Sequence, residues 1–195
     1  MEVKEAAPKY YPKMSPSEFL EWERKQECKH EYVNGEVFAM AGASFNHNRI
    51  ASNIIVSVGS FLKGRSCNVF GSDLRISVKW RSSYFYPDVT IVCDDPEFDN
   101  EQIKDTLKNP AVIFEILSAS TEDHDIGKKL MFYMQIESLK QYIIIDSRTI
   151  HLRVITRKEE GTWKFAEFTN MQDKVFIEPI NLDILVSDFY EGVSF

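Results

Sequence analysis

Apolar and polar positions along the chain recur with periods that predict most of its helices and strands. Apolar side chains repeat at helical spacing over about residues 44–62, and Gly64 follows as a C-terminal stop. Two short runs, 30–33 and 36–40, flank the dipeptide Asn34-Gly35. This dipeptide readily adopts positive φ at both turn positions, so the pattern predicts a β-hairpin.

Helix-start signals predict two further helices. Ser15 is suited to an N-cap, Pro16 to the first helical position and Glu18 to closing a capping box, which predicts a short helix to about Arg24. Asp125 is placed to cap a second helix that runs to about residue 137.

Strand-like runs occupy residues 68–80, 88–92 and 111–117, before that second helix. Residues 142–146 form a continuous apolar run typical of a buried central strand, and the preceding helix makes a parallel crossover the expected connection. Residues 150–156 and 162–168 predict a closing hairpin. The order favours an α/β or α+β fold: a mixed central sheet flanked by helices, with a hairpin extension at each end.

Length and composition favour one soluble domain. The 195 residues contain no linker-like stretch, so we expect an N-terminal arm over residues 1–13 and a single domain over 14–195. No secretory signal or membrane span is evident, and three cysteines without metal-ligand spacing fit a reducing compartment, so we expect a cytoplasmic protein. The net charge of -7 argues against broad nonspecific attraction to nucleic acid.

Two carboxylates interrupt neighbouring apolar strands. Asp88 opens one run and Glu115 lies in the middle of the next. A carboxylate buried in a strand is costly unless it is paired, hydrogen-bonded or bound to a cation. A lysine on the following helix could approach both acids, and a hard divalent cation with an ammonium beside it is suited to cleaving phosphodiesters.

Each candidate also has a structural interpretation. Asp88 could cap a turn after Pro87. Glu115 could meet a buried partner, and Lys129 could form an i, i+4 pair with Asp125 on a solvated helix face. Asp73 could extend the acidic cluster or open its strand as a polar residue. Two further residues near the candidate site, Tyr133 and His47, are more typical of core and first-turn positions and stay outside the catalytic set.

Four blocks occur in order: Asn34-Gly35-Glu36, residues 87–89, residues 115–121, and residues 125–129 followed by Tyr133. They resemble the family of proposed restriction endonucleases abundant in cyanobacteria, within the PD-(D/E)xK nuclease superfamily. The resemblance covers the chain from about Ser15 to its end. The ordered set of blocks is far more specific than any one of them.

The resemblance implies a DNA endonuclease dependent on Mg²⁺, or Mn²⁺ in its place, that acts as a homodimer. It implies Asp88 and Glu115 as metal ligands and Glu36 as a further ligand, although Glu36 could equally be a solvated hairpin charge. Leu117 occupies the position of the usual superfamily lysine. The family's helix lysine would be Lys129 here, with Lys128 as the alternative, and the number of metal ions stays open.

A nucleic-acid substrate requires a local basic surface on this acidic chain. Alternate positions Arg75, Lys79 and Arg81 would share one strand face and supply it, or they could simply be the solvent-facing row of an antiparallel strand. The leading hypothesis is therefore a metal-dependent DNA endonuclease. The alternatives are a noncatalytic nucleic-acid or partner-binding module that keeps the nuclease fold, and a structural homo-oligomer whose acids tie strands together.

Overall fold

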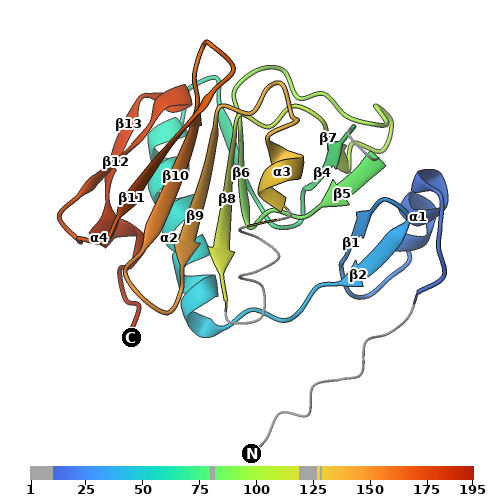
Figure 1. Ribbon diagram of the computed structural model, residues 1–195, viewed down its shortest axis with the longest axis horizontal. Coiled ribbons are helices and arrows are strands. Elements are labelled where there is room, and N and C mark those ends of the chain that lie inside the picture. The colour runs from blue at the N-terminus through green and yellow to red at the C-terminus, as the bar shows by residue number, and fades with distance from the viewer. Residues whose placement is uncertain (1–10, 80–81, 119–126, 128) are drawn as a thin grey trace, which may run out of the picture.

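The computed structural model describes residues 11–79, 82–118, 127 and 129–195. Within them, the centre of the molecule is a six-stranded mixed sheet (Figure 1). Strand β6 pairs antiparallel with β3 and β8, whereas β8 runs parallel to β9, as the crossover pattern predicts. Its strands, in spatial order, are β11 (Trp163–Phe168), β10 (Leu152–Arg157), β9 (Gln141–Asp146), β8 (Val112–Leu117), β6 (Val89–Val92) and β3 (Asn68–Gly71).

One face of this sheet packs against the long helix α2 (Phe45–Leu62), which Ser44 caps by accepting a hydrogen bond from the His47 N–H at 3.2 Å. Buried α2 side chains meet Val89, Phe114 and Ile143 of the sheet. The same face is covered by α4 (Val186–Phe189) and by a two-stranded sheet of β12 (Lys174–Ile177) and β13 (Leu182–Leu185), which the 3₁₀ turn Glu178–Ile180 connects. The N-terminal end of α2 reaches the candidate site.

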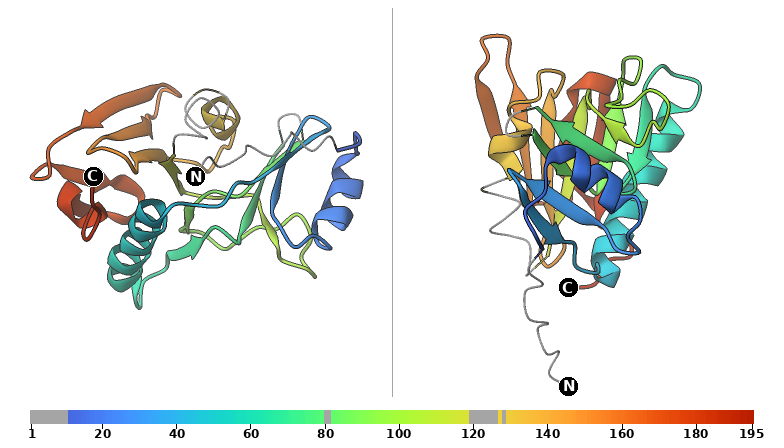
Figure 2. Two further views of the ribbon diagram at one scale, coloured as in Figure 1. Left: turned by 90° about the horizontal axis from the view of Figure 1, so that it is seen from below. Right: turned by 90° about the vertical axis from the view of Figure 1, so that its right-hand side faces the viewer.

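The opposite face meets the short helix α3 (Leu130–Tyr133) and a second, five-stranded sheet (Figure 2). Side chains of α3 and of this sheet join Ile113 and Leu117 in a second apolar cluster. In spatial order the strands are β2 (Glu36–Ala39), β1 (His30–Val33), β5 (Ser83–Phe85), β4 (Arg75–Val78) and β7 (Thr106–Leu107). Residues between the two sheets are therefore enclosed from both sides.

The N-terminal elements form as the sequence predicts. Helix α1 (Pro16–Glu23) has both hydrogen bonds of the capping box, and its Phe19 stacks on Tyr32 of β1. In the β1–β2 hairpin, Asn34 has a φ of 51° and Gly35 a φ of 93°, the turn geometry that this dipeptide favours. The helix thus packs directly on the strand that contributes to the candidate site.

The sequence predicts one continuous strand over residues 68–80, but the structure has two separate strands there. A turn closed by the Leu74 N–H to the Gly71 C=O divides it into β3 and β4, which lie in different sheets. Strands β5, β7, β12 and β13 and helix α4 were not predicted either. The expected Asp125 cap lies outside the described residues. Across those residues, no helix is both long and apolar enough to cross a bilayer.

The cysteines also differ from expectation, because the structure pairs two of them. The register Asn68↔Val92 places Cys67 opposite Cys93, and their sulfur atoms form a disulfide between β3 and β6. Cys28 is free and exposed. The odd cysteine count did not reveal this pair because sequence spacing carries no information on strand register.

A buried ion-pair network fixes the five-stranded sheet. The Arg75 guanidinium is 3 % exposed and donates to Thr106, Tyr86 and Asp105. Arg24 of the N-terminal region donates to the same Asp105 at 2.8 Å. Burial raises the pKa of Asp105, but the hydrogen bond from Arg24 and the charge of Arg75 outweigh burial and lower it below its ordinary value.

Substitution Asp105→Asn should therefore destabilise the fold in a pH-dependent way. A carboxyl whose pKa is lowered by folding stabilises the fold above its unfolded pKa and loses this effect as the pH falls through the folded pKa. We expect a loss of about 1.5 kcal/mol in unfolding free energy at pH 7 that shrinks below about pH 4. Urea denaturation at several pH values measures it; Asp94→Asn, at an exposed position, is the matched control. A pH-independent difference would contradict this role.

Candidate active site

Asp88 lies immediately before β6, at the N-terminal end of this interior strand of the central sheet. Because β6 pairs with β8 through Val89↔Phe114, continuing the antiparallel register places Asp88 opposite Glu115. Asp88 Oδ2 accepts a hydrogen bond from the Ile116 N–H at 2.7 Å, and Oδ1 lies 3.0 Å from His47 Nε2 of α2. The backbone of the neighbouring strand therefore holds the Asp88 carboxylate beside Glu115.

Glu115 is the one charged residue of β8 and is 3 % exposed. Its side chain lies on the sheet face that α3 covers, where the Tyr133 hydroxyl donates to Glu115 Oε1 at 2.7 Å. Burial and the nearby Glu115 charge raise the pKa of Tyr133 well above its ordinary value. Tyr133 therefore stays a hydrogen-bond donor at all physiological pH values.

Lys129 brings a positive charge to the same place. Its ammonium lies 2.8 Å from Glu31 Oε1 of β1 and donates to Glu115 Oε1 at 3.3 Å. All three side chains are at most 7 % exposed. Two buried carboxylates thus share the Lys129 ammonium, and Asp88 lies at the strand position opposite Glu115.

The comparisons with known proteins agree with this architecture. Residues 16–184 match the family described as "Uma2: Putative restriction endonuclease". The chain belongs to the Uma2 family. The family match confirms the resemblance expected from the sequence, and the structural match described below confirms the mixed α/β fold class.

Similar proteins come from cyanobacteria. The chain is 31 % identical over 185 residues to uncharacterized protein slr1290 of Synechocystis sp., with 95 % of each chain covered. It is 34 % identical over 155 residues to uncharacterized protein sll1609 of the same organism, with 79 % of this chain and 86 % of that protein covered. The crystal structure of a "putative nuclease belonging to DUF820" from Anabaena variabilis superposes with a TM-score of 0.76 at 19 % identity, covering 93 % of this chain and 99 % of that one. At that identity the likeness concerns the fold.

The structure brings together part of the predicted set. Glu115 and Lys129 are in direct contact, and Asp88 bonds to the residue that follows Glu115. Glu36 is exposed on β2. The side chain of Asp73 is 97 % exposed and pairs with Lys29. Lys128 lies outside the described residues.

Three residues at the site were missed or set aside by the sequence reasoning. Glu31 was missed, and His47 and Tyr133 were considered but excluded. Glu31 carries little sequence signal because its neighbours His30 and Tyr32 are also buried, so β1 shows no alternation. Tyr133 follows Lys129 by four residues, and this helical spacing was the available indication that both could meet one carboxylate.

The predicted basic surface is wrong for Arg75. Its guanidinium is buried against Asp105, because the strand that carries it lies inside the five-stranded sheet rather than along a solvent-facing row. Lys79 is exposed, and Arg81 lies outside the described residues. Arg75 is therefore a structural cation.

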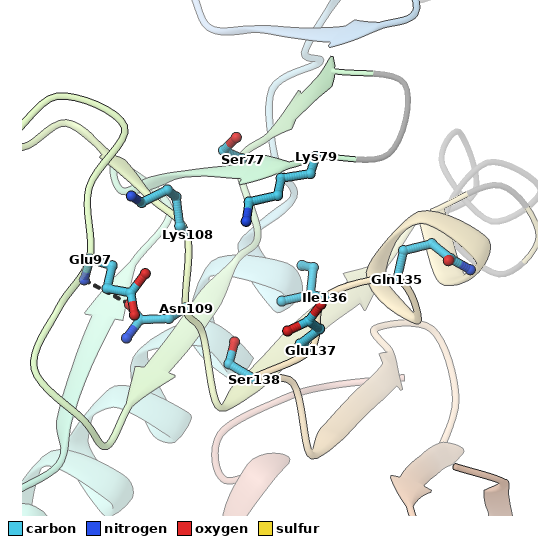
Figure 3. A pocket seen from close by; sticks show the side chains of 9 residues that line it. All are labelled: Ser77, Lys79, Glu97, Lys108, Asn109, Gln135, Ile136, Glu137 and Ser138. Atoms are coloured by element: carbon cyan, nitrogen blue, oxygen red, sulfur yellow. Dashed lines mark hydrogen bonds between the residues drawn. The ribbon is translucent and has the colours of Figure 1, made fainter.

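Lys79 instead lines a cavity of about 240 Å³ (Figure 3). This cavity lies where β8 and β9 begin, whereas Glu115 lies near the end of β8. It is therefore separate from the candidate site. Its lining combines two lysines and two glutamates with polar groups: Ser77, Lys79, Glu97, Lys108, Asn109, Gln135, Ile136, Glu137 and Ser138.

The donor set at the site is compatible with Mg²⁺, which prefers oxygen ligands and usually binds through one or two carboxylates while keeping several waters. Asp88 and Glu115 supply such carboxylates from opposed strand positions. Within the described ranges no group of three or more His, Cys, Asp or Glu side chains is arranged to hold a metal. The fit is therefore to a site with few protein ligands.

Removing the shared ammonium should destabilise the protein. Lys129→Met would leave Glu31 and Glu115 buried without their common counter-charge, so we expect a loss of about 3–5 kcal/mol in unfolding free energy at pH 7. Urea denaturation measures it, with Lys140→Met at an exposed position as the control. Adding Glu31→Gln to Lys129→Met should recover part of the loss. Equal stability of Lys129→Met and the control would contradict the ion-pair assignment.

Proposed function

We propose that this chain is a metal-dependent DNA endonuclease that hydrolyses phosphodiester bonds at the Asp88–Glu115 site. The observation that carries the proposal is the convergence of Glu115, Lys129 and Tyr133 beside Asp88, on a chain of the Uma2 family. Asp88 and Glu115 bring two carboxylates to opposed strand positions, and Lys129 contacts one of them. These are the donor types suited to a hard divalent cation and a phosphate.

In this proposal each side chain has a distinct role. Asp88 and Glu115 are the Mg²⁺ ligands, and the Ile116 N–H and the Tyr133 hydroxyl orient their carboxylates. The ion would supply a water of lowered pKa and polarise the phosphate. Lys129 stabilises the negative charge that develops on the phosphate oxygens while the water oxygen bonds to phosphorus and the P–O bond to the leaving sugar breaks.

The remaining two residues position the first set. Glu31 lies 2.8 Å from the Lys129 ammonium and so fixes its position beside Glu115. His47 holds the second oxygen of Asp88 from α2. The site therefore depends on both sheets and two helices, so it forms only when the whole domain is folded.

The test is cleavage of supercoiled plasmid DNA with Mg²⁺ or Mn²⁺. We expect the wild-type protein to nick the plasmid and both Asp88→Asn and Glu115→Gln to be slower by at least about 100-fold, because each removes one charged ligand. The isosteric changes keep a hydrogen-bond acceptor for the Ile116 N–H and the Tyr133 hydroxyl, so the fold should persist. Thermal denaturation with and without Mg²⁺ provides a readout independent of activity.

Asp94→Asn is the matched control, because it removes an exposed carboxylate just beyond the other end of β6. It should cleave and respond to Mg²⁺ like the wild type. Equal cleavage by all four proteins would reject the assignment. Binding of DNA without any cleavage or Mg²⁺ stabilisation would favour the noncatalytic module instead.

A further inference from the structure

A row of directly paired residues crosses the central sheet from the candidate site to the β10–β11 hairpin. The register pairs Glu115 with Ile144, Ile144 with Arg153 and Arg153 with Glu167. Directly paired residues point to the same face of a sheet, so this row lies on the face that carries α3. With strands about 4.8 Å apart, Arg153 is two strand spacings, or about 10 Å, from Glu115.

A small hollow of about 10 Å³ lies between them, lined by Leu117, Ile144, Asp146, His151 and Arg153. Leu117 is two residues after Glu115 and shares its face. The side chains of His151 and Arg153 are 26 % and 32 % exposed, so both can be reached from solvent. The hollow therefore lies on the same sheet face as Glu115, beside the hairpin residues His151 and Arg153.

The hairpin presents aromatic rings on this face. Phe165 pairs with Ile155 and Trp163 with Arg157, so these rings share the face of Arg153. Phe165 is 59 % exposed, although its strand pairs with β10 along its whole length. The Arg157 guanidinium lies 4.5 Å from the Trp163 ring centroid. An exposed ring beside cations is the arrangement that stacks nucleic-acid bases and holds their phosphates.

The charges on this face are only partly compensated. Arg157 donates to the backbone carbonyls of Met134, Ile136 and Leu139, which carry no formal charge, and the Glu137 carboxylate lies near enough to act on its charge. Arg153 pairs with Glu167, whose side chain is 62 % exposed, and His151 faces the same carboxylate at 3.7 Å. An exposed pair of this kind contributes little and can exchange its carboxylate for a phosphate. The face thus combines aromatic surface with cations whose carboxylate partner Glu167 is exposed and exchangeable, on a chain whose net charge is -7.

We infer that the α3-side face of the β10–β11 hairpin binds an unpaired DNA strand, with Arg153 and His151 on its phosphates and Phe165 stacked on a base, and leads that strand to the Asp88–Glu115 site. This inference rests on the proposed nuclease function. It assigns the DNA contact to exposed hairpin residues in place of the buried Arg75.

The test is fluorescence anisotropy with a labelled single-stranded DNA oligonucleotide in EDTA, where no cleavage occurs. We expect Phe165→Ala to weaken binding at least about fivefold, because stacking on an aromatic ring is lost. Arg153→Ala should weaken binding and reduce the slope of log K against log salt by about one. Duplex DNA of the same sequence should bind more weakly and be insensitive to Phe165→Ala.

Two matched variants serve as controls. Phe176→Ala removes a ring that is 44 % exposed on β12, and Arg65→Ala removes an exposed arginine that stacks on Phe61. Both should bind like the wild type. Absence of binding by the wild type, unchanged binding by Phe165→Ala and Arg153→Ala, or equal losses in the controls would overturn the inference.

Different experimental results would reject the DNA-binding surface and the proposed nuclease function. Metal-dependent plasmid cleavage that persists in Arg153→Ala and Phe165→Ala at wild-type rates would reject this surface and leave the nuclease site in place. Binding that depends on Phe165, without any cleavage, would reject the nuclease. A preference for single-stranded RNA over DNA of the same sequence would overturn the assignment to DNA.

Discussion

The ammonium of Lys129, buried between Glu31 and Glu115, is the interaction on which the site depends. A lysine taken out of water is costly unless its charge is met by closely placed acids. Here the two acids come from different sheets, β1 and β8, and the lysine leads into α3. One charge therefore ties three separate parts of the fold together at the point where the candidate chemistry lies.

The position of Glu31 depends in turn on a second buried network. The neighbouring His30 is held by Glu23 of α1, through its backbone N–H at 2.9 Å and its Nδ1 at 3.0 Å. Glu23 also accepts from the Tyr86 hydroxyl, two residues before Asp88. The N-terminal helix and hairpin thus support both ends of the acidic cluster, although none of their residues except Glu31 enters it.

The surroundings of each site residue explain whether the sequence could predict its role. Asp88 and Glu115 stand out because each interrupts an apolar run, and the resemblance pointed to Lys129. Glu31 could not be found in this way, because a strand enclosed on both faces has no polar side to contrast with. A related limit applies to the strand over 68–80: Gly71-Ser72-Asp73 interrupts its apolar pattern, but nothing local shows that the turn there sends its two halves to different sheets. Such long-range pairings, like Cys67 with Cys93, follow from register and not from local pattern.

Charge placement links the two proposed parts of the active surface. An acidic chain repels a polyanion at long range, so a DNA-cleaving site on it requires attraction that acts at short range. The carboxylates of the cluster would repel a phosphate unless a cation lies among them, whereas Arg153 lies two strand spacings away on β10 and the exposed ring of Phe165 three spacings away on β11. Separating the acidic centre from the cationic, aromatic surface allows each to keep its own sign of charge. The acidic centre and the hairpin surface lie on paired strands of one sheet. Strand pairing, rather than flexible loops, therefore fixes the spacing between them.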